Sequence, residues 1–200
     1  GGNVQQFVAN LLYPLGFIAV IIGRAQLFTE NTLYPVVLVL DERKHLLNTL
    51  RLWGTVFAAN NLGALGFAAL AVLSGALRPE YMRTLVEMGV DAAPGGFPHV
   101  FWSGVIGGWL IALVAWMVTA THYTIGQVVI VYLLTYLVGL GNFAHCIATS
   151  GELLSAVLAG SISAGGYLQW LLPATLGNIA GGVIIVSLLN YGQVVAGQEG

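Results

Sequence analysis

The chain has 200 residues, of which 58% are hydrophobic and 7% are charged, and its formal net charge at pH 7 is -2. A mean hydropathy of +0.86 excludes a soluble domain of this length, and so small a net charge gives no reason to expect a nucleic-acid partner. The stretches 52–77, 92–151 and 153–198 contain no Asp, Glu, Lys or Arg. Because a bilayer span needs about 20 apolar residues, we expect one integral membrane domain, residues 1–200, with several helices in the lipid bilayer.

Redox, metal and enzyme chemistry find little support in the sequence. Cys146 is the single cysteine, which excludes an intrachain disulfide. It follows His145, but a structural zinc ion takes four ligands, so we expect no metal and no cofactor. We find no paired carboxylates and no nucleophile next to a base on one helix face, so we expect no enzymatic activity.

The first half of the chain combines one very long apolar segment with one of ordinary length. Residues 4–40 are too many for one straight span and too few for two spans with a loop, so we predict a helix broken near 24–32. A charged loop at 41–45 follows, and then an unbroken helix over 46–77. The stretch 78–99 holds five charges, three prolines and three glycines, which predicts a surface connection with a short amphipathic helix at 81–88.

The second half has the same kinds of segment. In chain order we predict a helix at 100–120, a turn at 121–126, a long segment at 127–158 broken near 139–151, a small-residue loop at 159–166 and a helix at 167–191.

Two repeats of whole, broken and whole helices would need one more span, so we expect a helix before residue 1. The domain then divides into a first-repeat part at 1–77, a connecting loop at 78–99 and a second repeat at 100–191. Arg43, Lys44 and Arg51 place the 41–51 side in the cytoplasm by the positive-inside rule.

An offset of 118 residues relates the two halves. It carries Leu27 onto His145, Gly23 onto Gly141, and the Asn60-x-x-Gly63 motif onto Asn178-x-x-Gly181. Interrupted apolar segments at matching positions of two repeats indicate a solute pathway in the membrane.

His145 is the first candidate residue of that pathway. An ionisable group deep in a span is costly, so it usually faces a cavity. An imidazole has an ordinary pKa of about 6.5 and exchanges a proton near neutral pH. The alternative is a neutral core histidine bonded to a backbone carbonyl.

The two breaks are the second candidate. A broken helix exposes backbone N–H groups and a positive helix end, which together suit an anion, and the hydroxyls of Thr29 and Thr149 would add donors. Arg24 and Glu30 flank the first break, where they would pair; alternatively, Arg24 extends to the interface or attracts anions. We expect Glu152 to be solvated.

Amides and aromatic rings complete the candidate set. Asn60 and Asn178 would hydrogen-bond the broken backbone or, alternatively, touch the solute. Aromatic side chains on the broken segments would either pack or narrow the pore; they are Tyr13, Phe17, Phe28 and Phe143.

These landmarks resemble the formate/nitrite transporter family over almost the whole chain. The matching residues are Tyr13–Phe17, Gly23, Leu27–Thr29, Gly141–His145 and the two Asn-x-x-Gly motifs. The resemblance implies an aquaporin-like inverted-repeat bundle of six helices, assembled as a homopentamer in the bacterial inner membrane with one pore per subunit. It also implies passage of small monovalent weak-acid anions such as formate, nitrite or hydrosulfide, and it makes the expected helix before residue 1 the first helix of the family.

The chain departs from the family pattern at several polar positions. Gln26 replaces an acidic residue, Ala144 a glutamate, Gln127 a lysine, Gly108 an asparagine and Arg24 a small residue. One hypothesis is that Arg24 attracts anions in place of the lost lysine.

The leading hypothesis is that the solute takes up a proton from or through His145 and crosses the apolar constriction as a neutral acid, since an unpaired charge there is expensive. The alternatives are a neutral-solute channel, which the absence of an Asn-Pro-Ala motif disfavours, and a non-conducting membrane scaffold or sensor.

Overall fold

The computed structural model describes residues 2–33, 36, 39, 46–188, 193 and 197, and these contain helices and turns but no strand. The helices are α1 (Gly2–Ala9), α2 (Pro14–Ile22), α4 (Leu46–Leu73), α5 (Pro79–Ala92), α6 (Gly96–Val118), α7 (Thr124–Leu140), α8 (Ala148–Leu158) and α9 (Ala164–Ala180). Single 3-10 turns lie at Asn10–Leu12 and Glu30–Thr32, and a π-helical segment at Gly181–Leu188 continues α9. The predicted loop at 41–45 lies outside the described residues.

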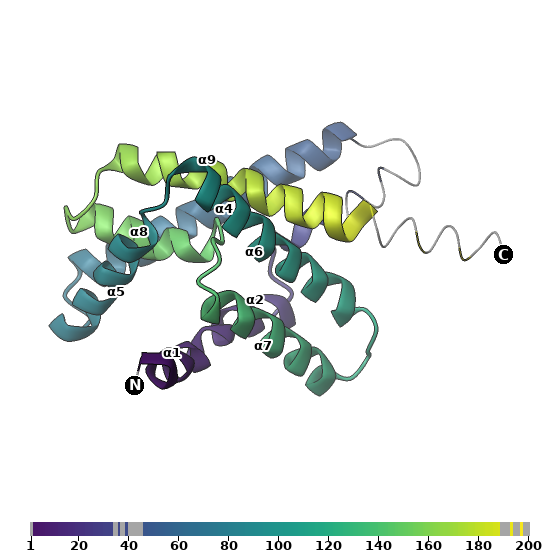
Figure 1. Ribbon diagram of the computed structural model, residues 1–200, viewed down its shortest axis with the longest axis horizontal. Coiled ribbons are helices and arrows are strands. Elements are labelled where there is room, and N and C mark those ends of the chain that lie inside the picture. Colours follow the sequence, from purple (N-terminus) through teal and green to yellow (C-terminus); the bar gives the residue numbers. More distant parts are fainter. Residues whose placement is uncertain are drawn as a thin grey trace.

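Three described helices are long and apolar enough to cross a bilayer by length and composition. They are Leu46–Leu73, Gly96–Val118 and Ala164–Val186. Two shorter apolar helices, Gln6–Ile22 and Thr124–Leu140, each lead into one of the breaks. Figure 1 shows α2 and α7 side by side in the lower part of the view and running in opposite directions, as an inverted repeat requires.

Both predicted breaks are present, and both begin with the same backbone motif. Gly23 caps the C-terminal end of α2 and Gly141 that of α7, and the next residues, Arg24 and Asn142, have left-handed φ angles of 56° and 49°. Two backbone hydrogen bonds close the C-terminal end of each of these helices in the pattern of a Schellman motif. They are Ala25 N–H to Val20 O and Arg24 N–H to Ile21 O, matched by Phe143 N–H to Val138 O and Asn142 N–H to Gly139 O. Each of these hydrogen bonds in the first break therefore has a counterpart 118 residues later in the second break.

Close packing between helices holds the second half of the chain together. Helix α6 lies along α9 and its π-helical continuation (Figure 1). A Cβ atom at Gly104 would come within 2.9 Å of the Ala174 carbonyl oxygen, so the two backbones approach as only a glycine allows. The equivalent helix of the first half, α4, is only 17% buried over its most apolar window, against 44% for α9, because no described helix covers α4 as α6 covers α9.

The connection between the halves differs from its prediction. A short helix at 81–88 was expected on the surface, whereas α5 spans Pro79–Ala92 and packs against α8. Pro79 at the first turn favours helix initiation, and buried Gly89 lets the helix lie directly on the Glu152 carbonyl. Helix α6 likewise begins at Gly96, ahead of the predicted residue 100.

Arg24 occupies a backbone conformation that favours glycine, so replacing it should stabilise the protein. A side chain with a Cβ atom in the left-handed region costs roughly 1 kcal/mol, and Arg24 is exposed, so little packing is lost. We expect Arg24→Gly to raise the thermal midpoint in detergent by about 2–4 °C. Arg24→Ala, which keeps the Cβ atom, is the control; an equal gain in both variants would show that the charge, and not the backbone, was responsible.

Candidate functional site

The two breaks meet at a hydrogen bond between His145 and Thr29. His145 lies between α7 and α8 and is fully buried, as is Thr29 from the first break. The Thr29 Oγ1 and His145 Nε2 atoms are 2.8 Å apart. The structure thus brings together one predicted residue from each half, 116 residues apart in the chain, away from lipid.

The hydrogen bonds of the imidazole decide its tautomer. The Ala148 amide donates to His145 Nδ1 at 2.9 Å, and the Ile147 amide does so at 3.3 Å. Because Nδ1 accepts these bonds, we assign the proton of the neutral ring to Nε2, which then donates to Thr29 Oγ1. The ring therefore bonds backbone amides, and not the backbone carbonyl of the alternative reading.

The positive end of α8 reaches the site through this ring. The amide of Cys146 donates to Asn178 Oδ1 at 2.9 Å, the next two amides donate to His145 Nδ1, and Thr149 N–H donates to the His145 carbonyl. The expectation that free N–H groups here bind an anion directly is wrong, because each of these four amides has a protein partner. The helix dipole acts on the imidazole instead.

Two asparagines hold the broken backbone by equivalent bonds. Asn60 accepts from Phe28 N–H at 2.9 Å and donates to the Gln26 carbonyl at 3.0 Å. Asn178 accepts from Cys146 N–H and donates to the Ala144 carbonyl at 2.9 Å, which are the same contacts displaced by 118 residues. The predicted hydrogen bonds from these amides to the breaks are therefore present.

The two amides differ in what remains free. Asn178 also donates to the Gly104 carbonyl at 2.7 Å, so its oxygen and both of its N–H groups are engaged, and its side chain is fully buried. Asn60 is half-buried and borders a hollow beside α4. Direct contact with a solute is thus open to Asn60 but not to Asn178.

A cavity of about 320 Å³ lies against the imidazole. Its walls include Tyr13, Phe17 and Leu27 together with His145, so four of the predicted pathway residues share it. The Phe17 ring meets the imidazole edge to face, with 5.2 Å between centroids, and lies 5.5 Å from the Tyr13 ring. The remaining wall residues are Gly16, Val20, Ile147, Ala148 and Glu152. The cavity is mostly apolar, and its polar wall residues are Tyr13, His145 and Glu152.

Other predicted residues lie outside this cavity. The Phe28 ring is buried against α4, 5.0 Å from Phe57 and 6.1 Å from Trp53 between centroids, so it packs there and does not line the His145 cavity. The Thr149 hydroxyl accepts from His145 N–H at 3.4 Å and borders a separate hollow of about 60 Å³ that Phe143 also lines.

Arg24 is exposed on the turn that ends α2, and among the described residues it makes no ion pair with Glu30. The expected pair across the first break is therefore wrong: Arg24 is exposed on the left-handed turn, whereas Glu30 is half-buried in the 3-10 turn Glu30–Thr32. Gln127, at the position of the family lysine, donates to the carbonyls of Val118 and Thr121 at 3.2 Å and brings no charge. Whether Arg24 attracts anions stays a prediction.

Glu152 is the site residue that sequence reasoning missed. It was expected in solvent, yet it is half-buried and forms part of the cavity wall. The available signal was spacing: Glu152 follows Ala148 by four residues, so the two share one face of α8. No group of three or more His, Cys, Asp or Glu side chains is arranged to hold a metal within residues 2–33 and 46–188.

Comparison with known proteins places the chain in a described family. The family model described as formate/nitrite transporter matches residues 1–192. The inner membrane protein YfdC of Escherichia coli is 36% identical over 189 residues, which cover 92% of this chain and 60% of that protein. A probable formate transporter of Methanothermobacter thermautotrophicus is 26% identical over 94% of this chain and 75% of its own length.

Solved structures show the same fold. A pentameric formate channel with formate bound superposes with a TM-score of 0.83 at 19% identity, covering 98% of this chain and 85% of that one. A second structure, an ion channel of the same family, gives a TM-score of 0.85 at 18% identity over 96% and 78% of the two chains. The fold is thus the aquaporin-like helical fold of these channels. The chain spans 60% of the length of YfdC.

The unequal burial of the two asparagines gives a test of their structural role. Asn178→Ala would leave Cys146 N–H and two carbonyls unpaired in a dry interior, at about 1–3 kcal/mol for each group. Asn60→Ala removes two bonds at a half-exposed site, where water replaces part of them. We expect the thermal midpoint in detergent to fall much further for Asn178→Ala. Equal losses would contradict the assignment.

Proposed function

Because this chain belongs to the formate/nitrite transporter family, we propose that it passes small monovalent anions of weak acids, of the formate and nitrite type, through a pore in each protomer. The pairing of His145 with Thr29 at the junction of the two breaks, beside an apolar cavity, is the observation that carries this proposal. The names of the similar proteins, a probable formate transporter and a formate channel, agree with it.

The geometry supplies hydrogen-bond donors where an anion needs them. His145 Nε2–H donates to Thr29 Oγ1, and the hydroxyl hydrogen of Thr29 then has no acceptor among the described residues. Thr29 is fully buried and lies behind the described cavity wall, so the proposal is that this hydrogen bonds an oxygen of a carboxylate or nitrite that reaches the His145 side of the cavity. The bonds run in one direction, from the Ala148 amide through the ring to the hydroxyl, so the partial positive charge of the α8 end strengthens the donor.

An ion in the apolar cavity still needs its charge removed. Transfer of an unpaired charge into a low-dielectric interior costs many kcal/mol, whereas the protonated weak acid crosses as a neutral molecule. His145 assists protonation by holding the anion, through Thr29, while it accepts a proton. The imidazole does not have to carry and release a second proton. Such a proton would sit on Nδ1, which already accepts hydrogen bonds from two backbone amides. Flux should rise as pH falls from 8 to 5.

We further propose a homopentamer in an inner membrane. The pentameric channel of the same fold supports the assembly, and the inner-membrane location named for YfdC supports the compartment. Large apolar side chains remain exposed along α4 in the single chain and suit contact with lipid or with another subunit; they include Leu62, Leu65, Phe67, Leu70 and Leu73.

A neutral-solute channel is the second candidate. No lysine or arginine lines the described wall of the His145 cavity, and the position of the family lysine is Gln127. Swelling of proteoliposomes in urea, compared with uptake of formate and nitrite, separates the two functions. A protein that passes none of these solutes would be a scaffold or sensor.

The donor pair can be removed without removing the helix cap. Asparagine at residue 145 can still accept from the α8 amides but has no counterpart of Nε2. We expect His145→Asn to keep its thermal midpoint within a few degrees and to lose at least tenfold of the formate flux into proteoliposomes. Thr29→Val should lose a similar factor and Thr29→Ser, which keeps the hydroxyl, should not. Full flux in both His145→Asn and Thr29→Val would reject the proposed site.

A further inference from the structure

Glu152 is an acidic side chain placed where an anion pathway would be expected to avoid one. It lies one turn into α8 and lines the cavity that contains Tyr13, Phe17 and His145. It also borders a second hollow, of about 450 Å³, between α8, α4 and α5. The residue is therefore a shared wall of two hollows and is only half-exposed in the single chain.

No basic group in the described part of the chain pairs with this carboxyl. Among the described residues Glu152 forms no ion pair and no side-chain hydrogen bond, and the ion pair that the described residues do contain is Arg78 with Glu80 at the surface. Such an unpaired acid in a membrane interior is costly, and in membrane proteins such groups mark proton or solute pathways.

The titratable neighbours of Glu152 can be named element by element. Helix α2 contributes Tyr13 and the second break contributes His145. Helix α4 contributes Asn60 and Phe67, and helix α5 contributes Leu85, none of which titrates. Three charged residues of α5 line a different hollow; they are Arg83, Glu87 and Asp91. Glu80, also on α5, pairs with Arg78 at the surface. Tyr167 of α9 is hydrogen-bonded to Asn61 and Ser150.

The imidazole is poorly placed to act as the acid. A second proton would have to go on Nδ1, which already accepts the amides of Ile147 and Ala148. A proton there would face two other hydrogens and break the cap of α8. Glu152 is the one carboxyl in the described wall of the His145 cavity, and its proton has no competing protein acceptor among the described residues.

We propose that Glu152 is the acid that protonates the permeating anion, and that its ionised form repels anions from the His145 cavity. This inference rests on the proposed anion transport. In the step itself, the O–H bond of the Glu152 carboxyl breaks and an O–H bond forms on the anion. Neutral acid and a Glu152 carboxylate result, and water on the same side returns a proton to the carboxylate. His145 and Thr29 position the anion but exchange no proton.

The two charge states of Glu152 have opposite effects, and this links flux to pH. The protonated carboxyl donates a hydrogen bond and then a proton, so it admits the anion. The carboxylate adds a like charge to an apolar cavity, where screening by salt is weak, so it excludes the anion. The pH dependence of flux therefore belongs to Glu152.

The test compares formate flux in proteoliposomes at equal internal and external pH, at pH 5 and at pH 8, after subtraction of flux into empty liposomes. For the unsubstituted chain we expect at least tenfold more flux at pH 5. Glu152→Gln, nearly the same size but without charge or acid, should reduce this ratio to about two or less. Glu152→Asp should keep the ratio near that of the parent chain.

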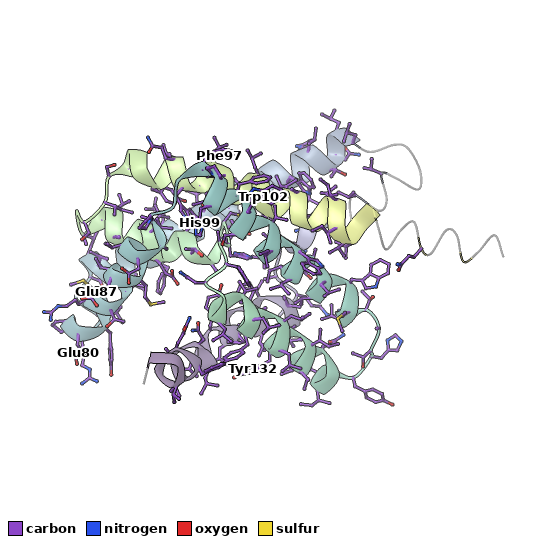
Figure 2. All side chains as sticks on the ribbon, in the orientation of Figure 1. Glu80, Glu87, Phe97, His99, Trp102 and Tyr132 are labelled. Carbon is purple, nitrogen blue, oxygen red and sulfur yellow. The ribbon has the colours of Figure 1, made fainter. Side chains whose placement is uncertain are left out.

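Two further variants separate charge at the site from charge elsewhere and from the imidazole. Glu87→Gln is the matched control, because Glu87 projects from α5 at the edge of the molecule (Figure 2) and is exposed. It should change neither flux nor ratio. His145→Asn should lower flux at both pH values but keep the ratio, since the acid is still present.

Each outcome bears on one proposal. If the unsubstituted chain passes neither formate nor nitrite at either pH, the proposed function fails. If it passes them and Glu152→Gln keeps the ratio of the parent chain, the assignment of Glu152 is overturned while the function stands. Should Glu152→Gln not fold, as judged by its thermal midpoint, a ratio near one in Glu152→Asp would overturn the assignment.

Discussion

Unwound backbone inside a membrane has to find hydrogen-bond partners within the protein, and two asparagine side chains meet that requirement here. Each side chain accepts a hydrogen bond from one backbone amide of a break and donates to the carbonyl two residues earlier. For Asn60 these are Phe28 N–H and the Gln26 carbonyl. For Asn178 they are Cys146 N–H and the Ala144 carbonyl. Lipid offers no alternative partner. These bonds help to fix the segments that carry Thr29 and His145, whose side-chain atoms lie 2.8 Å apart.

The same scaffold then carries different chemistry in its two halves. The offset that superposes the backbone bonds sets His145 against Leu27 and Thr29 against Ile147. The polar pair thus consists of one residue from each repeat, and its symmetry-related partners, Leu27 and Ile147, are apolar and line the cavity that His145 also lines. The inverted repeat places the two breaks together. The positions where the two repeats differ in sequence, His145 against Leu27 and Thr29 against Ile147, give the junction its polar pair.

The N-terminal end of α8 exerts its partial positive charge on side chains of the protein. The first amides of α8 are taken up by the imidazole and by Asn178, so the dipole of the helix orients a ring instead of meeting a solute. That arrangement fixes the tautomer of His145 and directs Nε2–H toward Thr29. In the proposed mechanism two tasks are separate: the fixed neutral ring of His145 holds the anion, and the carboxyl of Glu152 supplies the proton.

The sequence by itself determined the membrane class, both breaks, the 118-residue repeat and the hydrogen-bonding role of Asn60 and Asn178, because these follow from segment length, hydropathy and spacing along one chain. Tertiary structure alone decided which side chains reach the cavity. Phe28 turned onto α4, Thr149 onto the His145 backbone and Glu152 into the cavity wall. Those directions depend on how each helix is rotated and which neighbour covers it. Outside regular helices, as at Phe28, periodicity gives no direction at all, and on α8 it gives a face without saying what that face meets.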